Sequence, residues 1–195
     1  MNISVITPTW QRHDILINRC LPSVTAQTVP VEHIVVSDGP DPVLRELLAG
    51  FDVTYVEVDE HHTEGVNVGG WARNRGLEFA SGDFIAYLDD DNVFRPSHVE
   101  LLATALAEHP DRDFAYSQMF RHGLGDVIGS DPPCYGCIDS SIIMHRADTH
   151  RKLGPWPAPS EYHIDWQIVQ SWLLAGGTWV FVPEVTVDYY FRGYV

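Results

Sequence analysis

The amino-acid sequence predicts an α/β protein with a mostly parallel central sheet flanked by helices. Four short runs rich in β-branched and aromatic residues occupy positions 3–7, 33–37, 53–58 and 84–88. Helical patterns alternate with them at 14–26, 42–49 and 68–80. Such alternation is typical of the βαβ units of a doubly wound sheet. The runs at 34–36 and 84–88 do not alternate with polar residues, as expected of parallel strands buried on both faces.

The second half of the chain predicts two more helices and two more strands. The helix at 97–108 should begin at a capping box formed by Ser97 and Glu100, so that 89–95 is a loop. A helix at 165–175 should end at the glycine pair 176–177, with strands at 178–182 and 185–191 after it. Residues 121–133 are rich in Gly and Pro without a clear period, which predicts a mobile loop. No repeat or linker interrupts the pattern, so we expect one domain over 1–195.

Composition narrows the class of protein. A chain of 195 residues that is 45% hydrophobic can bury a real core. Its formal net charge of −15 argues against nucleic acid as a partner. The stretch 145–152 contains Arg, Lys and His and is either a local basic patch or a solvated helix face. No long apolar run or basic leader is present, which predicts a cytoplasmic protein without a membrane span.

The three cysteines do not predict a disulfide framework. An odd count argues against structural disulfides, and the pair Cys134 and Cys137 lacks the second pair that a zinc site would need. Prolines precede this pair and an apolar run follows it, whereas a redox motif is expected at the start of a helix. The sequence therefore favours an inert loop here.

Polar residues follow each of the first four predicted strands, at 7–12, 37–39, 59–62 and 89–92. The carboxyl ends of parallel strands share one edge of a sheet, and ligands bind there. Residues 7–12 contain no glycine, which excludes a nicotinamide-binding fingerprint or a P-loop after the first strand. The adjacent carboxylates of Asp89, Asp90 and Asp91 suit Mg²⁺ or Mn²⁺, with an acidic surface turn as the alternative. His61 and His62 are either a pair of metal ligands or, as we prefer, part of a solvated turn.

Five segments, taken in order, resemble motifs of the inverting GT-A glycosyltransferases of family 2. They are VITPTWQR at 5–12, VVSDG at 35–39, GWARNRG at 70–76, YLDDDN at 87–92 and IDW at 164–166. The resemblance runs from residue 5 to about residue 191. It implies a single GT-A, Rossmann-like domain over 1–195, with a nucleotide-binding half at about 1–92 and an acceptor-binding half at about 93–195.

The resemblance also implies residue roles. Thr9 and Asp38 would read the base, and Asp89 would lie near the ribose. Asp91 would hold Mn²⁺ or Mg²⁺, and Asp165 would be the general base. The full implied nucleotide-binding set is Pro8, Thr9, Trp10, Arg12, Asp38, Arg73, Asp89 and Asp90.

Some of these residues have other readings. Asp165 stands where a helix should begin and could be its N-cap. Arg73 could be an exposed helix residue, and Trp10 and Trp166 could pack in the core instead of stacking on base or sugar. Two family positions that are usually acidic are Ile164 and Asn92 here.

The implied activity is metal-dependent transfer of one sugar from a nucleoside-diphosphate sugar to an unknown hydroxyl acceptor. UDP is expected before GDP or dTDP. The processive synthases' Q-x-x-R-W motif and membrane helices are absent, which favours a single transfer. The alternatives are a nucleotidyltransferase, disfavoured because Lys152 is the one lysine in the chain, and a non-catalytic binding module. The acceptor and the oligomeric state are not encoded in any pattern.

Overall fold

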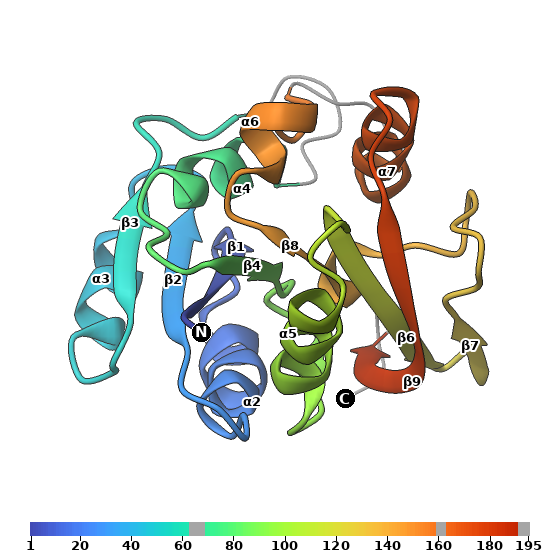
Figure 1. The fold of residues 1–195 in the computed structure, drawn as a ribbon. Coiled ribbons are helices and arrows are strands. Elements are labelled where there is room, and N and C mark those ends of the chain that lie inside the picture. Colours follow the sequence, from blue (N-terminus) through green and yellow to red (C-terminus); the bar gives the residue numbers. More distant parts are fainter. Residues whose placement is uncertain (63–68, 159–162, 191–195) are drawn as a thin grey trace.

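A computed structural model describes residues 1–62, 69–158 and 163–190. One curled sheet runs through the molecule with helices packed on it (Figure 1). The strand order is β3-β2-β1-β4-β8-β6-β9-β5, and β7 pairs with β6 off this path. The predicted α/β class is therefore confirmed.

The first half of the chain forms a parallel sheet from the four predicted apolar runs. These are β1 (Ile3–Thr9), β2 (Glu32–Ser37), β3 (Thr54–Glu57) and β4 (Phe84–Tyr87), in the order β3-β2-β1-β4. All seven residues of β1 and all four of β4 are buried, and for β4 this is what its unbroken apolar run predicts. The chain builds outward from β1 to β3 and then returns to the other side of β1. The carboxyl ends of β1 and β4 therefore flank the point where the strand order reverses, which is where open α/β sheets bind ligands.

The predicted helices of this half are present. Residues 13–25 form one helical stretch made of α1 (His13–Ile15), a π-helical turn (Leu16–Cys20) and α2 (Leu21–Thr25). The next helix, α3 (Pro42–Leu48), is capped by the side chain of Asp41, which accepts from the Leu44 N–H at 3.0 Å. Helix α4 (Gly70–Leu77) is shorter than the predicted 68–80, whose first residue lies outside the described part of the chain.

Helix α4 lies directly on β1 and β2. A Cβ added at Gly76 would come within 2.5 Å of Ile6 Cγ2 and 3.2 Å of Val36 Cγ2. Only glycine allows this approach, and the approach sets how α4 carries Arg73 toward the end of β1.

The second half of the sheet is mixed. It contains β5 (Val93–Phe94), β6 (Phe114–His122), β7 (Asp126–Ile128), β8 (Ile143–Arg146) and β9 (Trp179–Tyr190). Strand β8 runs antiparallel to both β4 and β6, whereas β9 is parallel to β6. Among the described residues the sheet has four parallel and four antiparallel pairings, so the expected mostly parallel order holds only in the first half.

Three predictions for this half were wrong in detail. Residues 121–133 are not a featureless loop, because Met119 to Arg121 pair with Asp126 to Ile128 in a hairpin. The two strands expected after residue 177 are one strand, β9, whose register against β6 shifts beside Pro183, where a proline can sit in a bulge. The expected end at residue 191 lies outside the described residues. The predicted loop 89–95 contains the two-residue strand β5, which pairs with β9.

The helices of this half are α5 (His98–Glu108), a 3₁₀ turn (Ser140–Ile142), α6 (Thr149–Leu153) and α7 (Ile164–Leu174). The predicted capping box of α5 was wrong, because Ser97 makes no side-chain cap and Glu100 accepts a hydrogen bond from the Thr28 hydroxyl at 2.6 Å. The glycine stop of α7 is confirmed: Gly176 has φ +84°, and the Gly177 N–H donates to the Trp172 carbonyl at 2.8 Å.

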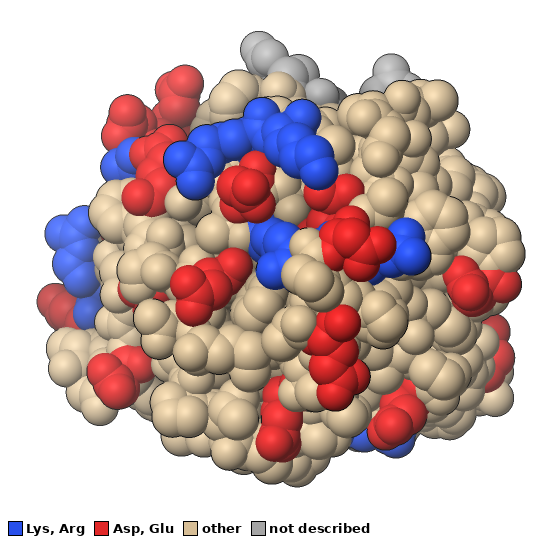
Figure 2. All heavy atoms as spheres, viewed as in Figure 1, with Lys and Arg blue, Asp and Glu red and all other residues tan. Residues whose placement is uncertain are grey.

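The basic stretch at 145–152 does not form one patch. Figure 2 shows a band of Lys and Arg over α6 with acidic side chains beside it. His145 is fully buried, and the Arg146 guanidinium donates to the carbonyls of Leu106 and Arg112. The Lys152 ammonium pairs with Asp113 at 2.5 Å. The exposed part is therefore a solvated helix face with balancing acids.

Candidate active site

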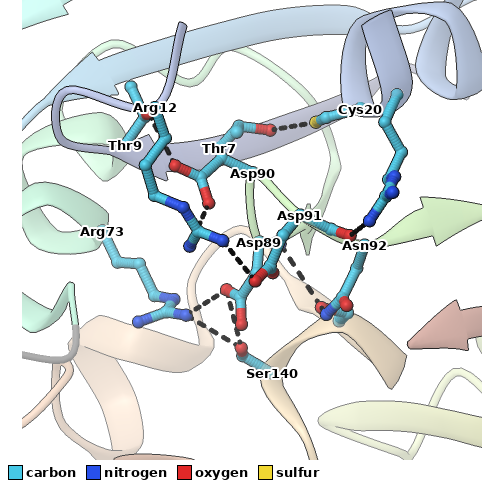
Figure 3. A network of polar contacts seen from close by, with 12 residues as sticks. Thr7, Thr9, Arg12, Cys20, Arg73, Asp89, Asp90, Asp91, Asn92 and Ser140 are labelled. Carbon is cyan, nitrogen blue, oxygen red and sulfur yellow. Dashed lines mark hydrogen bonds and ion pairs between the residues drawn. The ribbon is translucent and has the colours of Figure 1, made fainter. Parts of the chain in front are cut away.

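The acidic loop lies at the reversal point of the sheet, between the ends of β1 and β4 (Figure 3). It begins directly after β4 and turns back at once, with the Asn92 N–H donating to the Asp89 carbonyl at 3.0 Å. Thr9, the last residue of β1, donates its hydroxyl to Asp90 at 2.7 Å. This bond joins the ends of the two strands. The predicted loop position is therefore confirmed.

Arg12 is the counter-ion of this loop. Its guanidinium binds Asp90 at 2.8 Å and Asp91 at 2.5 Å (Figure 3). Asp90 is 4% exposed, and its burial raises the pKa of its carboxyl to about 7 although Arg12 and Thr9 act in the opposite direction. The Asp91 side chain is 22% exposed. Asp90 is therefore the buried anchor of the loop, while Asp91 is partly exposed to solvent.

Arg73 forms the other wall of the site. It is 2% exposed, and its guanidinium lies 4.8 Å above the ring of Trp156. One of its nitrogens donates both to Asp89 and, at 2.8 Å, to the Ser140 hydroxyl. That hydroxyl in turn donates to Asp89 at 3.2 Å. Arg73 is thus a buried cation inside the site, and its interpretation as an exposed helix residue was wrong.

Asp165 joins the same network from α7. Its carboxylate accepts the Ser140 N–H at 3.1 Å. It lies in the first turn of the helix, whose N-cap position is held by His163, so the alternative that Asp165 is the N-cap was wrong. Burial raises the pKa of Asp165, Arg73 opposes this effect, and the charge of Asp89 adds to it. A carboxylate with a raised pKa beside an acidic loop is a candidate proton acceptor.

A further carboxylate, Asp139, lies beside this pair. It accepts the Ser141 N–H at 2.8 Å and caps the 3₁₀ turn. Burial raises its pKa well above the usual range, and the charges of Asp165 and Asp89 add to that rise. The three carboxylates therefore repel one another, which makes a cation at this edge favourable.

A second cluster surrounds Asp38 at the end of β2. The Nδ1 atoms of His61 and His62 lie 3.0 and 2.9 Å from its two carboxylate oxygens. Trp10 stacks on His61 at 4.1 Å between ring centroids, and Trp71 stacks on His62 at 4.5 Å. The expected solvated turn at 61–62 was wrong, because both rings orient Asp38 instead of facing only water.

The structure brings most of the predicted site residues together. Figure 3 shows six of them around the acidic loop: Thr9, Arg12, Arg73, Asp89, Asp90 and Asp91. Asp165 contacts the same network through the Ser140 N–H. Trp10 and Asp38 belong to the histidine cluster. Pro8 is buried and its ring lies against Gly69, so its contact with a nucleotide stays a prediction. Because Thr9 and Asp90 are each 4% exposed, nucleotide contacts by their side chains stay predictions.

Several important residues were missed by sequence reasoning. Ser140 connects Arg73, Asp89 and Asp165, yet one serine in an irregular segment carries no signal. Trp156, the platform under Arg73, was missed for the same reason. The acidic residue at 139 and the two histidines were visible as polar positions, but nothing in the sequence showed what they would face.

Comparison with known proteins gives the family to which this fold belongs. The model of Glycosyl transferase family 2 matches residues 4–152, and the chain belongs to that family. The uncharacterized glycosyltransferase YwdF of Bacillus subtilis is 32% identical over 182 residues, covering 85% of this chain and 66% of YwdF. The succinoglycan biosynthesis protein ExoW of Rhizobium meliloti is 36% identical over 103 residues, covering 50% of this chain and 31% of ExoW. The chain therefore spans less than two thirds of these relatives.

Solved structures share the fold. S. aureus TarS 1–349 in complex with UDP-GlcNAc matches with a TM-score of 0.77 at 18% identity, covering 100% of this chain and 60% of that one. The mannosyltransferase PcManGT from Pyrobaculum calidifontis, in complex with GDP-Man and Mn²⁺, matches with a TM-score of 0.70 at 17% identity, covering 99% and 58%. Both likenesses establish the GT-A-like architecture.

The donor set at the acidic loop fits a divalent cation that is shared with a substrate. Asp91 and Asp89 are partly exposed hard-oxygen donors, at 22% and 30% of their side chains. Within residues 1–62, 69–158 and 163–190, no group of three or more His, Cys, Asp and Glu is placed to hold an ion. Such a loop suits Mg²⁺ or Mn²⁺ that takes its other ligands from phosphate and water.

None of the described helices combines the length and the apolarity needed to cross a membrane.

Proposed function

We propose that the chain transfers one sugar from a nucleoside-diphosphate sugar to an acceptor hydroxyl, with inversion at the anomeric carbon. The observation that carries this proposal is the chain of contacts Arg73, Asp89, Ser140 and Asp165. It holds a carboxylate of raised pKa beside a loop suited to a metal-bound diphosphate. Residues 1–92 would bind the donor and 93–195 the acceptor, as one domain. A cytoplasmic location stays part of this proposal.

A uridine nucleotide is the preferred donor in this proposal, ahead of GDP or dTDP. TarS has been solved with UDP and with UDP-GlcNAc, whereas PcManGT has been solved with GDP-Man, so the fold alone admits more than one base. Asp38 would face the base from the end of β2. Its two oxygens are already oriented by His61 and His62, and this orientation favours one pattern of hydrogen-bond donors on the base.

The proposed metal ion is Mn²⁺ or Mg²⁺, held by Asp91 together with the diphosphate. When bound, such an ion stabilises the negative charge that grows on the departing nucleoside diphosphate. Arg12 and Arg73 would add positive charge on either side of the same group. The chain would therefore offer two cations where the leaving group is proposed to gain charge.

Asp165 is the proposed general base. As the acceptor oxygen attacks the anomeric carbon, its proton passes to the Asp165 carboxylate and the bond to the diphosphate oxygen breaks. The Ser140 N–H keeps the carboxylate oriented during this step. General-base catalysis contributes roughly 10²–10⁴-fold.

The test measures release of nucleoside diphosphate from UDP-, GDP- and dTDP-sugars with Mn²⁺ or Mg²⁺, using simple glycosides and water as acceptors. Asp165→Asn should lower the rate at least about 100-fold while a thermal shift by the donor is kept. Asp111→Asn is the matched control, since that side chain is 69% exposed and lies between α5 and β6. Equal rates for Asp165→Asn and wild type would refute the proposed base. Donor binding without any turnover by the wild type would identify a binding module, and release of pyrophosphate would identify a nucleotidyltransferase.

A further inference from the structure

The segment before the 3₁₀ turn holds a pair of cysteines in a closed turn. The Cys137 N–H donates to the Cys134 carbonyl at 3.1 Å, which brings the two ends of the Cys-Tyr-Gly-Cys sequence together. Gly136 has φ +78°, a conformation that glycine adopts without strain. Both cysteines are partly exposed, whereas Cys20 is buried. The pair is therefore both close and accessible.

The two thiols face each other in this turn. The interaction between them lowers the pKa of Cys134 and raises that of Cys137. The Ser130 hydroxyl lies 3.4 Å from Cys134 Sγ and also favours its thiolate. Cys134 is thus the better nucleophile and Cys137 is placed to react second. Sequence alone favours an inert loop, but these contacts point to reactivity.

The turn leads directly into the acceptor side of the site. Asp139 and Ser140 follow within three residues of Cys137, and the Ser140 N–H binds Asp165. A covalent closure of the turn would restrict the backbone that carries this N–H. The placement therefore connects the cysteine pair with the carboxylate network through the chain itself.

We propose that Cys134 and Cys137 form a reversible intramolecular disulfide that restrains the segment leading into Ser140. The oxidant is a small-molecule disulfide such as oxidised glutathione. The Cys134 thiolate attacks one of its sulfurs and releases one glutathione thiolate. The Cys137 thiolate then attacks Cys134 Sγ in the mixed disulfide and releases the second glutathione thiolate. Two electrons pass from the cysteine pair to the oxidant, and an excess of dithiol reverses both steps. This inference does not depend on the proposed transfer reaction.

The first test equilibrates the whole chain with glutathione buffers, blocks free thiols with N-ethylmaleimide, and maps the peptides by mass spectrometry. Under excess oxidised glutathione most molecules should carry the 134–137 disulfide, and dithiothreitol should remove it. Cys137→Ser should stop at a glutathione adduct on Cys134. Cys134→Ser should form its adduct at least about tenfold more slowly. Cys20→Ser is the matched control and should behave like the wild type, since Cys20 is buried.

The second test compares amide hydrogen exchange of residues 138–141 in the reduced and oxidised wild type. Oxidation should slow exchange there by about threefold or more, with no such change in Cys134→Ser. If the wild type yields only mixed disulfides or intermolecular dimers in every buffer, the reversible pair is refuted. If the disulfide forms and exchange at 138–141 does not change, the restraint on the Ser140 segment is refuted.

Discussion

Asp90 is a carboxylate that the fold buries between Thr9 and Arg12, and replacing it with asparagine should remove a pH dependence of stability. Its pKa rises from 3.8 to about 7 in the folded protein. Each pKa unit corresponds to about 1.36 kcal/mol, so ionised Asp90 costs roughly 4 kcal/mol of folding free energy above about pH 8. The native state binds this proton more tightly than the unfolded chain does. The stability that protonated Asp90 contributes is therefore fully present below about pH 4 and is lost as the pH rises through about 7.

The same relation gives the size of the effect over an accessible range. Between about pH 5 and pH 8 the ionisation of Asp90 should cost about 2.5 kcal/mol. Asp90→Asn has no such ionisation, and its amide oxygen can still accept the Thr9 hydroxyl. The free energy of unfolding of Asp90→Asn should therefore gain on that of the wild type by about 2.5 kcal/mol as the pH rises over this range.

Urea denaturation at several pH values, with EDTA present to remove divalent cations, measures this difference. The control is Asp52→Asn, an exposed carboxylate between α3 and β3 that changes the formal charge by the same amount. Its stability should run parallel to that of the wild type at every pH. Parallel curves for Asp90→Asn and wild type would show that burial does not control this carboxyl.

Three further predictions concern the walls of the site. Gly76→Ala should destabilise the fold by about 1–3 kcal/mol through the collision with β1, which calorimetry would show as a Tm about 3–10 °C lower. Arg73→Met should lower the free energy of unfolding by about 1–3 kcal/mol in urea denaturation. Because Arg73 lowers the pKa of Asp165, this variant should also move the acid limb of the rate profile to higher pH. Arg12→Gln should strengthen Mn²⁺ binding without nucleotide about fivefold, measured by electron paramagnetic resonance, because it frees Asp91 from an ion pair.

Each of these variants has a control variant that should behave like the wild type. Gly50→Ala adds a methyl with nothing within 4 Å. Arg75→Met changes a 40% exposed arginine on the same helix, and Arg45→Gln breaks one ion pair on a 63% exposed arginine. An unaltered Tm for Gly76→Ala would contradict the packing of α4. An acid limb that stays in place in Arg73→Met would show that Arg73 does not lower the pKa of the proposed general base. Weaker Mn²⁺ binding in Arg12→Gln would mean that Arg12 helps to hold the ion.

The parallel half of the fold and its ligand edge could be predicted because they depend on local patterns. The unbroken apolar runs at 34–36 and 84–88 indicated strands buried on both faces, and their alternation with helices indicated the parallel topology. The acidic loop followed from its position after a buried strand. The glycine stop at 176–177 was also local, since a left-handed residue needs no distant partner.

The rest depended on distant partners that no local pattern encodes. Glu100 binds Thr28 across 72 positions of sequence, so the local capping box did not form. Residues 119–121 pair with 126–128 because the long strand β6 extends past the core, not because of a strong turn signal. Arg73 looked exposed in the helix pattern, but Trp156 and Ser140, which cover it, arrive from the other half of the chain.

Ser140 connects two carboxylates that have different proposed roles. Its hydroxyl contacts Asp89, which is proposed to lie near the donor, and its N–H contacts Asp165, the proposed general base. If either carboxylate moves, the other must therefore move with it or a hydrogen bond to Ser140 must break. Because both carboxylates bind the same residue, a substitution that changes the proposed donor site should also affect the proposed base, and the effects of paired substitutions across Ser140 should not add.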